Sequence, residues 1–235
     1  MTTLRRVRLG PQPAVPVERS LASPTPPAAL TSRSKRALDV VAAMLLLALS
    51  SPIWLCAAVI IRLTSPGPIL FRQQRIGVDG APFTVLKFRT MHHGASDEAH
   101  RQLVTKMIRE GGMADGTPYK LNGDKRIIEG VRWLRSTSLD ELPQLINVLR
   151  GEMSLVGPRP PLPYEVEHYE ERQRERLSVR PGITGLWQVS GRNRLTFQEM
   201  CALDRAYIDT WSLWFDVKIM LMTPWVMFVD HGGAS

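Results

Sequence analysis

The sequence predicts a monotopic membrane protein: a mainly α-helical chain with a small β-hairpin, attached to a membrane from one side. Three observations support this fold class: a basic stretch at the start, one long uncharged apolar run, and amphipathic helical patterns over most of the remaining chain. We expect a disordered basic tail over residues 1–36, a re-entrant membrane helix over residues 37–62, and a larger domain with interfacial helices over residues 63–235.

The positive charge of the protein is concentrated in its first 36 residues. They contribute +6 of the formal net charge of +8, so the rest of the chain is nearly neutral. A basic segment beside an apolar run is typical of attraction to anionic lipid, at about 1 kcal/mol per basic residue. Nucleic-acid binding is the alternative, but the segment lacks interleaved aromatic residues that stack on bases. We therefore expect a lipid partner and no nucleic acid.

The uncharged run of 22 residues from Val40 to Ile61 is long enough to cross a bilayer. As a straight helix it would measure ~33 Å, against a hydrocarbon core of ~30 Å. However, Ser51 and Pro52 lie at its centre, where proline removes an amide donor and clashes with the preceding turn. Basic residues flank both ends, which satisfies the positive-inside rule if both ends face the cytoplasm. These features favour a re-entrant helix broken at Ser51-Pro52; a kinked spanning helix is the alternative.

A small hairpin and a helix are expected next. Ile69 to Phe71 and Pro82 to Phe88 have the composition of short strands on either side of a turn at Gly77–Gly80. Residues Ser96 to Glu110 then form an amphipathic pattern with Ser96 as its cap. A glycine-rich loop should follow as far as Asp124.

Three further helices are expected in the second half of the chain. Ser138 and Glu141 have capping-box spacing and precede an apolar stripe that ends at Gly151. A highly charged helix is expected over residues 165–177. Thr196 opens another capped helix. The stripe residues of the first of these helices are Leu142, Leu145, Ile146 and Leu149.

The last 25 residues contain four of the aromatic side chains expected at a headgroup boundary. Polar residues and Pro224 interrupt this segment, so it is too short in apolar residues to span a membrane. It favours an interfacial amphipathic helix, and a soluble helix packed on a partner is the alternative. The aromatic residues are Trp211, Trp214, Phe215 and Trp225.

Two adjacent acids, Asp140 and Glu141, stand at the start of a predicted helix. Adjacent helical residues do not share a face, so the two carboxylates would not flank a single bond. In a first turn, however, one carboxylate can attack while the other binds a metal, and the helix dipole favours an incoming phosphate. Plain helix capping is the alternative.

Basic side chains that could bind phosphate are expected on the elements around this pair. Arginine offers a planar fork for bidentate phosphate contacts. Arg159 stands between two prolines that hold its backbone extended. The candidates are Lys87, Arg89, Arg126, Arg135 and Arg159.

At these residues the chain resembles the bacterial polyprenyl-phosphate sugar-1-phosphate transferases, the small monotopic phosphoglycosyl transferases that prime exopolysaccharide assembly. The resemblance covers about residues 34–229 and rests on many motifs in order. They are Lys35-Arg36 with Asp39, Ser51-Pro52, Ser65-Pro66-Gly67-Pro68, Lys87-Phe88-Arg89-Thr90-Met91, Ser138 to Leu145, Gly151 to Pro160, and Arg180 to Gln188.

The resemblance implies an activity, which we state as an expectation. An aspartate, here Asp140, attacks the β-phosphate of a UDP-sugar; UMP leaves, and undecaprenyl phosphate then takes the sugar phosphate from the aspartyl-phosphosugar. Glu141 would be the partner of Asp140 near a Mg²⁺ ion, with both carboxylates as metal ligands. The expected substrate-binding residues are Lys87, Arg89, Asp124, Arg126, Arg135, Gln144 and Arg159.

The same resemblance implies a location and a substrate preference. We expect a core-only enzyme at the cytoplasmic face of a bacterial inner membrane, in contact with lipid, with a homodimer as one oligomeric state to test. The stretch from Ser190 to Asn193 is closest to hexose transferases, for galactose or glucose. The alternative from another class is a non-enzymatic membrane-anchored adaptor of a polysaccharide assembly complex.

Overall fold

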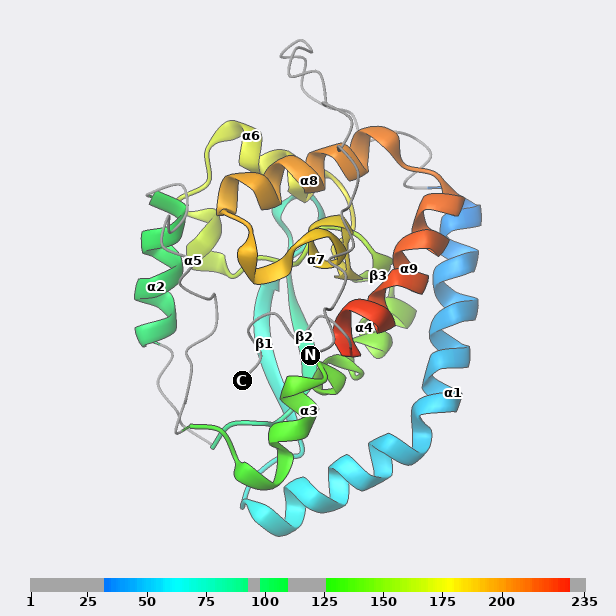
Figure 1. The fold of residues 1–235 in the computed structure, drawn as a ribbon, viewed down its shortest axis with the longest axis vertical. Coiled ribbons are helices and arrows are strands. Elements are labelled where there is room, and N and C mark those ends of the chain that lie inside the picture. The colour runs from blue at the N-terminus through cyan, green and yellow to red at the C-terminus, as the bar shows by residue number, and fades with distance from the viewer. Residues whose placement is uncertain (1–31, 93–97, 110–125, 229–235) are drawn as a thin grey trace, which may run out of the picture.

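The computed structural model describes residues 32–92, 98–109 and 126–228 (Figure 1). Helices dominate this part of the chain, and its strands form two small two-stranded sheets. The predicted mainly α fold with a β-hairpin is therefore confirmed. Most of the predicted tail lies outside the described residues, and its predicted boundary at residue 36 falls inside the first helix.

The apolar run forms one helix, α1 (Arg33–Thr64), which continues through Pro52. Ser32 caps its first turn by accepting a hydrogen bond from the amide three residues later, at 3.3 Å. The hydroxyls of Ser50 and Ser51 donate to carbonyls three residues earlier, at 3.4 and 2.8 Å. In Figure 1, α1 bends sharply, so that its first half runs beside α9 and its second half crosses below α3. It is the one described helix that is long and apolar enough to cross a membrane.

The predicted hairpin is confirmed, with a longer first strand. Strands β1 (Leu70–Ile76) and β2 (Pro82–Phe88) pair antiparallel through a 3-10 turn, Val78–Gly80. The register places Gln73 opposite Val85. Because side chains alternate along a strand, one face of this hairpin carries Phe71, Gln73, Arg75, Phe83, Val85 and Lys87.

The second sheet is parallel and depends on glycine. Strands β3 (Ser154–Val156) and β4 (Gly182–Thr184) run side by side. A Cβ atom on Gly182 would lie 2.1 Å from the Gly157 amide nitrogen and 2.5 Å from the Thr184 carbonyl oxygen. Both neighbours are backbone atoms that cannot move aside, so a larger residue would separate the two strands.

The sequence predicted that the acidic pair lies in the first turn of a capped α-helix, and this prediction is wrong. Ser138 is left-handed (φ 55°) and makes no side-chain cap, and a 3-10 turn over Leu139–Glu141 precedes α4 (Gln144–Arg150). Pro143 explains the difference, because it has no amide to donate to the Leu139 carbonyl four residues earlier. The Leu142 amide bonds that carbonyl instead, at 3.2 Å. The predicted end at Gly151 is confirmed by its left-handed φ of 84°.

The prediction of a single charged helix over residues 165–177 is wrong. The chain instead forms α5 (Pro163–Val166), α6 (Glu171–Arg174) and a 3-10 helix, Glu175–Ser178. Gln173 accepts a hydrogen bond from the Glu170 amide at 2.9 Å, so that amide starts a new helix rather than continuing the old one.

Two of the remaining helices, α8 and α2, follow the predicted patterns. α8 (Phe197–Thr210) begins with the predicted capping box, in which Thr196 and Glu199 bond each other's amides at 2.8 and 3.2 Å. α2 (Glu98–Arg109) buries Val104, Met107 and Ile108, while its predicted cap and the glycine-rich loop lie outside the described residues. The others are α3 (Arg132–Ser136), α7 (Leu186–Ser190), α9 (Leu213–Phe228), and 3-10 helices Glu129–Val131 and Arg192–Arg194.

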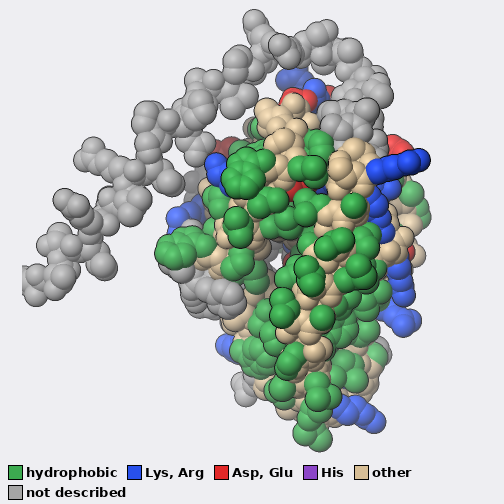
Figure 2. Space-filling view, turned by 90° about the vertical axis from the view of Figure 1, so that its right-hand side faces the viewer, with side chains coloured by type: hydrophobic (Ala, Val, Ile, Leu, Met, Phe, Trp, Pro, Cys, Tyr) green, Lys and Arg blue, Asp and Glu red, His purple; other side chains and the backbone are tan. Residues whose placement is uncertain are grey.

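Apolar side chains remain exposed along both halves of α1 and along α9. Trp214 is 73% exposed and Trp225 is 68% exposed. Figure 2 shows this face, where hydrophobic side chains form a broad area with basic residues toward its edges. A surface of this kind is typical of contact with lipid or with another protein. Its residues are Val41, Met44, Leu45, Leu46, Leu49, Leu55, Val59, Leu63, Leu213, Trp214, Leu221, Met222 and Trp225.

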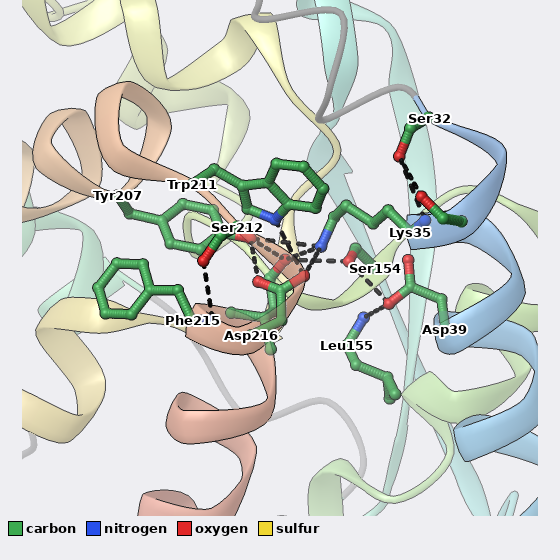
Figure 3. A network of polar contacts seen from close by, with 12 residues as sticks. Ser32, Lys35, Asp39, Ser154, Leu155, Tyr207, Trp211, Ser212, Phe215 and Asp216 are labelled. Carbon is green, nitrogen blue, oxygen red and sulfur yellow. Dashed lines mark hydrogen bonds and ion pairs between the residues drawn. The ribbon is translucent and has the colours of Figure 1, made fainter.

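The start of α1 is fastened to the domain by a buried polar network (Figure 3). Lys35 donates to Asp216 of α9 at 2.7 Å and to the Val156 carbonyl at 3.2 Å. The same carboxylate accepts from Tyr207 at 2.7 Å and from the Trp211 indole at 3.0 Å. Burial beside this carboxylate raises the pKa of the Tyr207 phenol, which therefore stays a neutral donor.

Arg36 and Asp39 of α1 make a second set of contacts with the domain. Asp39 accepts hydrogen bonds from the Ser154 hydroxyl and the Leu155 amide, both at 3.0 Å. Arg36 donates to the carbonyls of Val148 and Leu149, at 2.6 and 2.9 Å, at the end of α4. The start of α1 is thus fixed to β3, α4 and α9 together.

Candidate active site

The acidic pair lies where the 3-10 turn meets α4. Asp140 is 9% exposed, and the Glu141 side chain is 18% exposed. Lys87, the penultimate residue of β2, donates to Glu141 Oε1 at 2.6 Å. Arg159 Nη1 lies 3.7 Å from the same oxygen. One carboxylate therefore stands between two cations from distant parts of the sequence.

These side chains line a small open pocket between the hairpin and the parallel sheet. β2 contributes Lys87, α4 begins at the pocket with buried Gln144, and the loop after β3 contributes Arg159. The lining residues are Arg75, Val85, Lys87, Glu141, Gln144, Arg159, Pro160, Gly182 and Ile183. A pocket with three cations and one carboxylate suits an anionic ligand such as a diphosphate.

Burial and the neighbouring charged side chains shift the pKa of Lys87. Burial lowers the pKa of its amine below the usual 10.5, while the neighbouring Glu141 and, to a smaller extent, Asp140 raise it. Arg159 and Arg75 lower it further. The ion pair with Glu141 thus opposes the effect of burial on the pKa of Lys87.

The structure brings some of the predicted site residues together and places others elsewhere. Lys87, Glu141, Gln144 and Arg159 line the pocket, whereas Asp140, the neighbour of Glu141 in the chain, is not among the lining residues. Arg89 is buried and donates to the Ser65 and Pro66 carbonyls at 2.7 and 2.6 Å, so it fixes the turn that follows α1.

Two more predicted residues lie outside the pocket lining, and one lies outside the described residues. Arg126 follows the glycine-rich segment, and its carbonyl accepts from the His92 amide at 2.9 Å, beside the end of β2. Arg135 is half-buried on α3, just before the turn that carries Asp140. Asp124 is not among the described residues.

Sequence reasoning missed Arg75, which lies deep in the pocket lining. Its signal was present, because the alternation of the hairpin puts Arg75 and Lys87 on one face once the register is known. Gly182 and Ile183 were also missed as lining residues. They come from the parallel strand β4, whose three residues carry no periodic pattern that would identify a strand.

The carboxylates present fit a magnesium ion in part. Mg²⁺ is usually held by one or two carboxylates together with substrate phosphates and water, and Asp140 and Glu141 supply two such groups. Within the described residues no group of three His, Cys, Asp or Glu side chains could hold a metal unaided. The donor set therefore suits an ion that arrives with a phosphate-bearing substrate.

An exposed apolar surface, together with a pocket lined by three cations and one carboxylate, is typical of a class of proteins: membrane-associated proteins that handle phosphate groups. Comparison with known proteins refines this. The chain belongs to the bacterial sugar transferase family, whose model matches residues 30–230. The resemblance inferred from the motifs, and with it the prediction of a transferase, is confirmed.

Similar proteins carry related names. The chain is 46% identical over 217 residues to a UDP-glucose:undecaprenyl-phosphate glucose-1-phosphate transferase of Caulobacter vibrioides, covering 88% of this chain and 74% of that protein. It is 40% identical over 199 residues to the exopolysaccharide production protein ExoY of Rhizobium meliloti, covering 85% and 87%. An Escherichia coli enzyme with the same name as the Caulobacter protein is 40% identical, covering 88% of this chain but 42% of its own length.

The relatives differ in how much of their length this chain matches. It spans less than half of the Escherichia coli protein and 43% of a Streptococcus agalactiae galactosyl transferase, CpsE. It spans most of the shorter relatives such as ExoY.

Proposed function

We propose that the protein transfers a hexose-1-phosphate, galactose or glucose, from a UDP-sugar to undecaprenyl phosphate, with release of UMP. This would be the initiating step of exopolysaccharide or glycan assembly. Family membership and the names of the relatives support the reaction class. The structural observation that carries the proposal is the placement of Glu141 between Lys87 and Arg159, directly after Asp140, at one pocket.

In the first half of the proposed reaction, a carboxylate oxygen of Asp140 attacks the β-phosphorus of the UDP-sugar. The bond from this phosphorus to the bridging oxygen breaks, and UMP leaves with the electron pair. Lys87 and Arg159 offset the negative charge of the diphosphate. Without these two cations, the Asp140 carboxylate and the diphosphate would repel each other. The product is a phosphosugar joined to Asp140.

In the second half, a phosphate oxygen of undecaprenyl phosphate attacks the same phosphorus. The bond to Asp140 breaks, which regenerates the carboxylate and gives a lipid diphosphate sugar. Glu141, held by the two cations, keeps them in place when UMP has left the pocket.

We propose Mg²⁺ as the cofactor, held by Asp140 and Glu141 with substrate oxygens. Such an ion would supply positive charge at the reacting phosphate. Lys87 and Arg159 also supply positive charge at this phosphate. Removing the metal should therefore separate the contribution of the ion from that of the two side chains.

The arrangement of α1 supports a re-entrant membrane helix, with the site at the cytoplasmic face. A straight helix of 32 residues would place its ends ~48 Å apart. Instead, both ends of α1 bond to the same domain, through Lys35 at the start and through Arg89 bonds to Ser65 and Pro66 after the end. The bend of α1 (Figure 1) and the exposed apolar side chains of both halves fit insertion to mid-bilayer and return.

The activity is tested by UMP release from UDP-glucose and UDP-galactose, by purified full-length protein in lipid nanodiscs with Mg²⁺. We expect release by the wild type and none by Asp140→Asn. Without undecaprenyl phosphate, labelled UMP should exchange into the UDP-sugar, because only a covalent intermediate permits this exchange. Asp79→Asn, in the exposed hairpin turn, is the matched control.

Undiminished UMP release by Asp140→Asn would refute the nucleophile assignment. Release without exchange would refute the covalent intermediate. No release from any nucleotide sugar would instead support the membrane adaptor.

The topology is tested by impermeant maleimide labelling of Leu30→Cys and Pro68→Cys in a chain without other cysteines. A re-entrant helix predicts that both positions react from the cytoplasmic side of intact vesicles. Labelling from opposite sides would establish a spanning helix.

A further inference from the structure

The segment from Gly157 to Leu162 carries Arg159 into the pocket but has few donors with which to hold itself. Three of its residues lack an amide hydrogen: Pro158, Pro160 and Pro161. The segment is therefore fixed largely through its carbonyl oxygens. The Gly182 amide donates to the Pro158 carbonyl at 2.8 Å, and the Ile76 amide donates to the Pro161 carbonyl at 3.0 Å.

The carbonyl directly after Arg159 is held by a side chain. Arg75 Nη1 donates to the Pro160 carbonyl at 2.9 Å, while its Nε and Nη2 donate to the Gln73 amide oxygen at 3.2 and 2.8 Å. Arg75 is 6% exposed and lines the pocket. Gln73 lies on the same face of β1, so the strand fixes the direction in which the guanidinium fork points.

We propose that Arg75 is a positioning residue of this site: by bridging Gln73 and the Pro160 carbonyl, it sets Arg159 opposite Lys87 so that both cations can hold one anionic phosphate group. The identity of the substrate in this inference rests on the proposed function; the anion-binding role of the pocket does not.

The chemistry of arginine explains why this position needs that residue. Its rigid planar fork can bond Gln73 and Pro160 at once, whereas a lysine has a single nitrogen at the end of a flexible stem. Loss of Arg75 would leave the buried Pro160 carbonyl without this donor, and the segment would relax toward other partners. Arg159 would then sample positions away from Glu141.

The experiment measures binding of inorganic pyrophosphate by calorimetry, with the full chain in lipid nanodiscs. We expect Arg75→Gln to weaken affinity about tenfold, which corresponds to the loss of one hydrogen bond from a charged group. Arg75→Lys should weaken it similarly, because charge without the fork does not hold the segment. Arg72→Gln, an exposed arginine on the same strand, is the matched control and should bind as the wild type does.

The decisive comparison is a double-mutant cycle with Arg159→Gln. If Arg75 acts through Arg159, Arg75→Gln should change affinity less than twofold once Arg159 is absent. The inference would be overturned if Arg75→Gln lowered the pyrophosphate affinity equally with and without Arg159. It would also be overturned if Arg75→Lys bound pyrophosphate as tightly as the wild type, or if the wild type did not bind it. Thermal unfolding is recorded for every variant, and Arg75→Lys carries the comparison if Arg75→Gln does not fold.

UMP release measured in parallel separates the two hypotheses. A cycle with the expected coupling, in a protein that releases no UMP from any UDP-sugar, would leave Arg75 as a positioning residue and reject the proposed function.

Discussion

Removing Lys87 should weaken the site by a predictable amount. Lys87→Met deletes the hydrogen bond of 2.6 Å to Glu141 and leaves that carboxylate with Arg159 at 3.7 Å. At equal dielectric, Coulomb attraction at the longer distance is weaker by ~1.4-fold, so Arg159 cannot fully replace the lost partner. A hydrogen bond to a charged group contributes about 1.5–3 kcal/mol, equivalent to roughly 10- to 150-fold in rate.

The assay is the initial rate of UMP release at several UDP-sugar concentrations. We expect kcat/KM to fall within that range for Lys87→Met. For the wild type, kcat/KM should also fall as the pH rises through the pKa of Lys87, which burial places below 10.5. In Lys87→Arg this alkaline fall should disappear, because arginine stays charged.

The sign of the linkage separates this effect from unfolding. Because the pKa of Lys87 is lower in the folded protein, the unfolded chain holds more protons between the two pKa values. The contribution of Lys87 to stability therefore rises with pH in that window. A value of kcat/KM within threefold of the wild type for Lys87→Met, or an unchanged alkaline fall in Lys87→Arg, would refute the reasoning.

Two further predictions concern other parts of the chain. Burial raises the pKa of the Cys201 thiol to about 11, so near neutral pH a maleimide should label the exposed Cys56 in detergent and leave Cys201 intact; two labels before denaturant is added would contradict this. Gly182→Ala should cost ~3 kcal/mol or more by thermal unfolding, because its methyl group meets backbone at 2.1 Å. Gly80→Ala, where only a φ of 79° opposes the side chain, should cost about 1 kcal/mol, and equal losses in the two variants would be evidence against the close approach of β3 and β4.

The features that local pattern determines were predictable from the sequence. The capping box of α8 and the left-handed end of α4 at Gly151 each depend on residues within a few positions of one another, and the hairpin depends on a short turn between two strand-like segments. The two adjacent acids, Asp140 and Glu141, were likewise identified from the sequence, although they lie in a 3-10 turn before Pro143 and not in the predicted α-helix.

The features that depend on distant contacts were not predictable in the same way. Lys87 and Arg89 are two residues apart and belong to one motif, yet the chain leaves the strand after Phe88 and Arg89 turns to the end of α1. Arg75 is one of many basic residues until the hairpin register and the Pro160 carbonyl are known. In both cases a partner from elsewhere in the chain determines the role.

The network at the start of α1 has a consequence for biosynthesis. The partners of Lys35, Arg36 and Asp39 lie between 112 and 181 residues further along the chain. While the ribosome is still making the middle of the protein, this end of the helix has nothing to bond to. The bonds of Arg36 and Asp39 can form once residues 148–155 have been made, but the ion pair of Lys35 must wait for Asp216 of α9, 181 residues further along the chain.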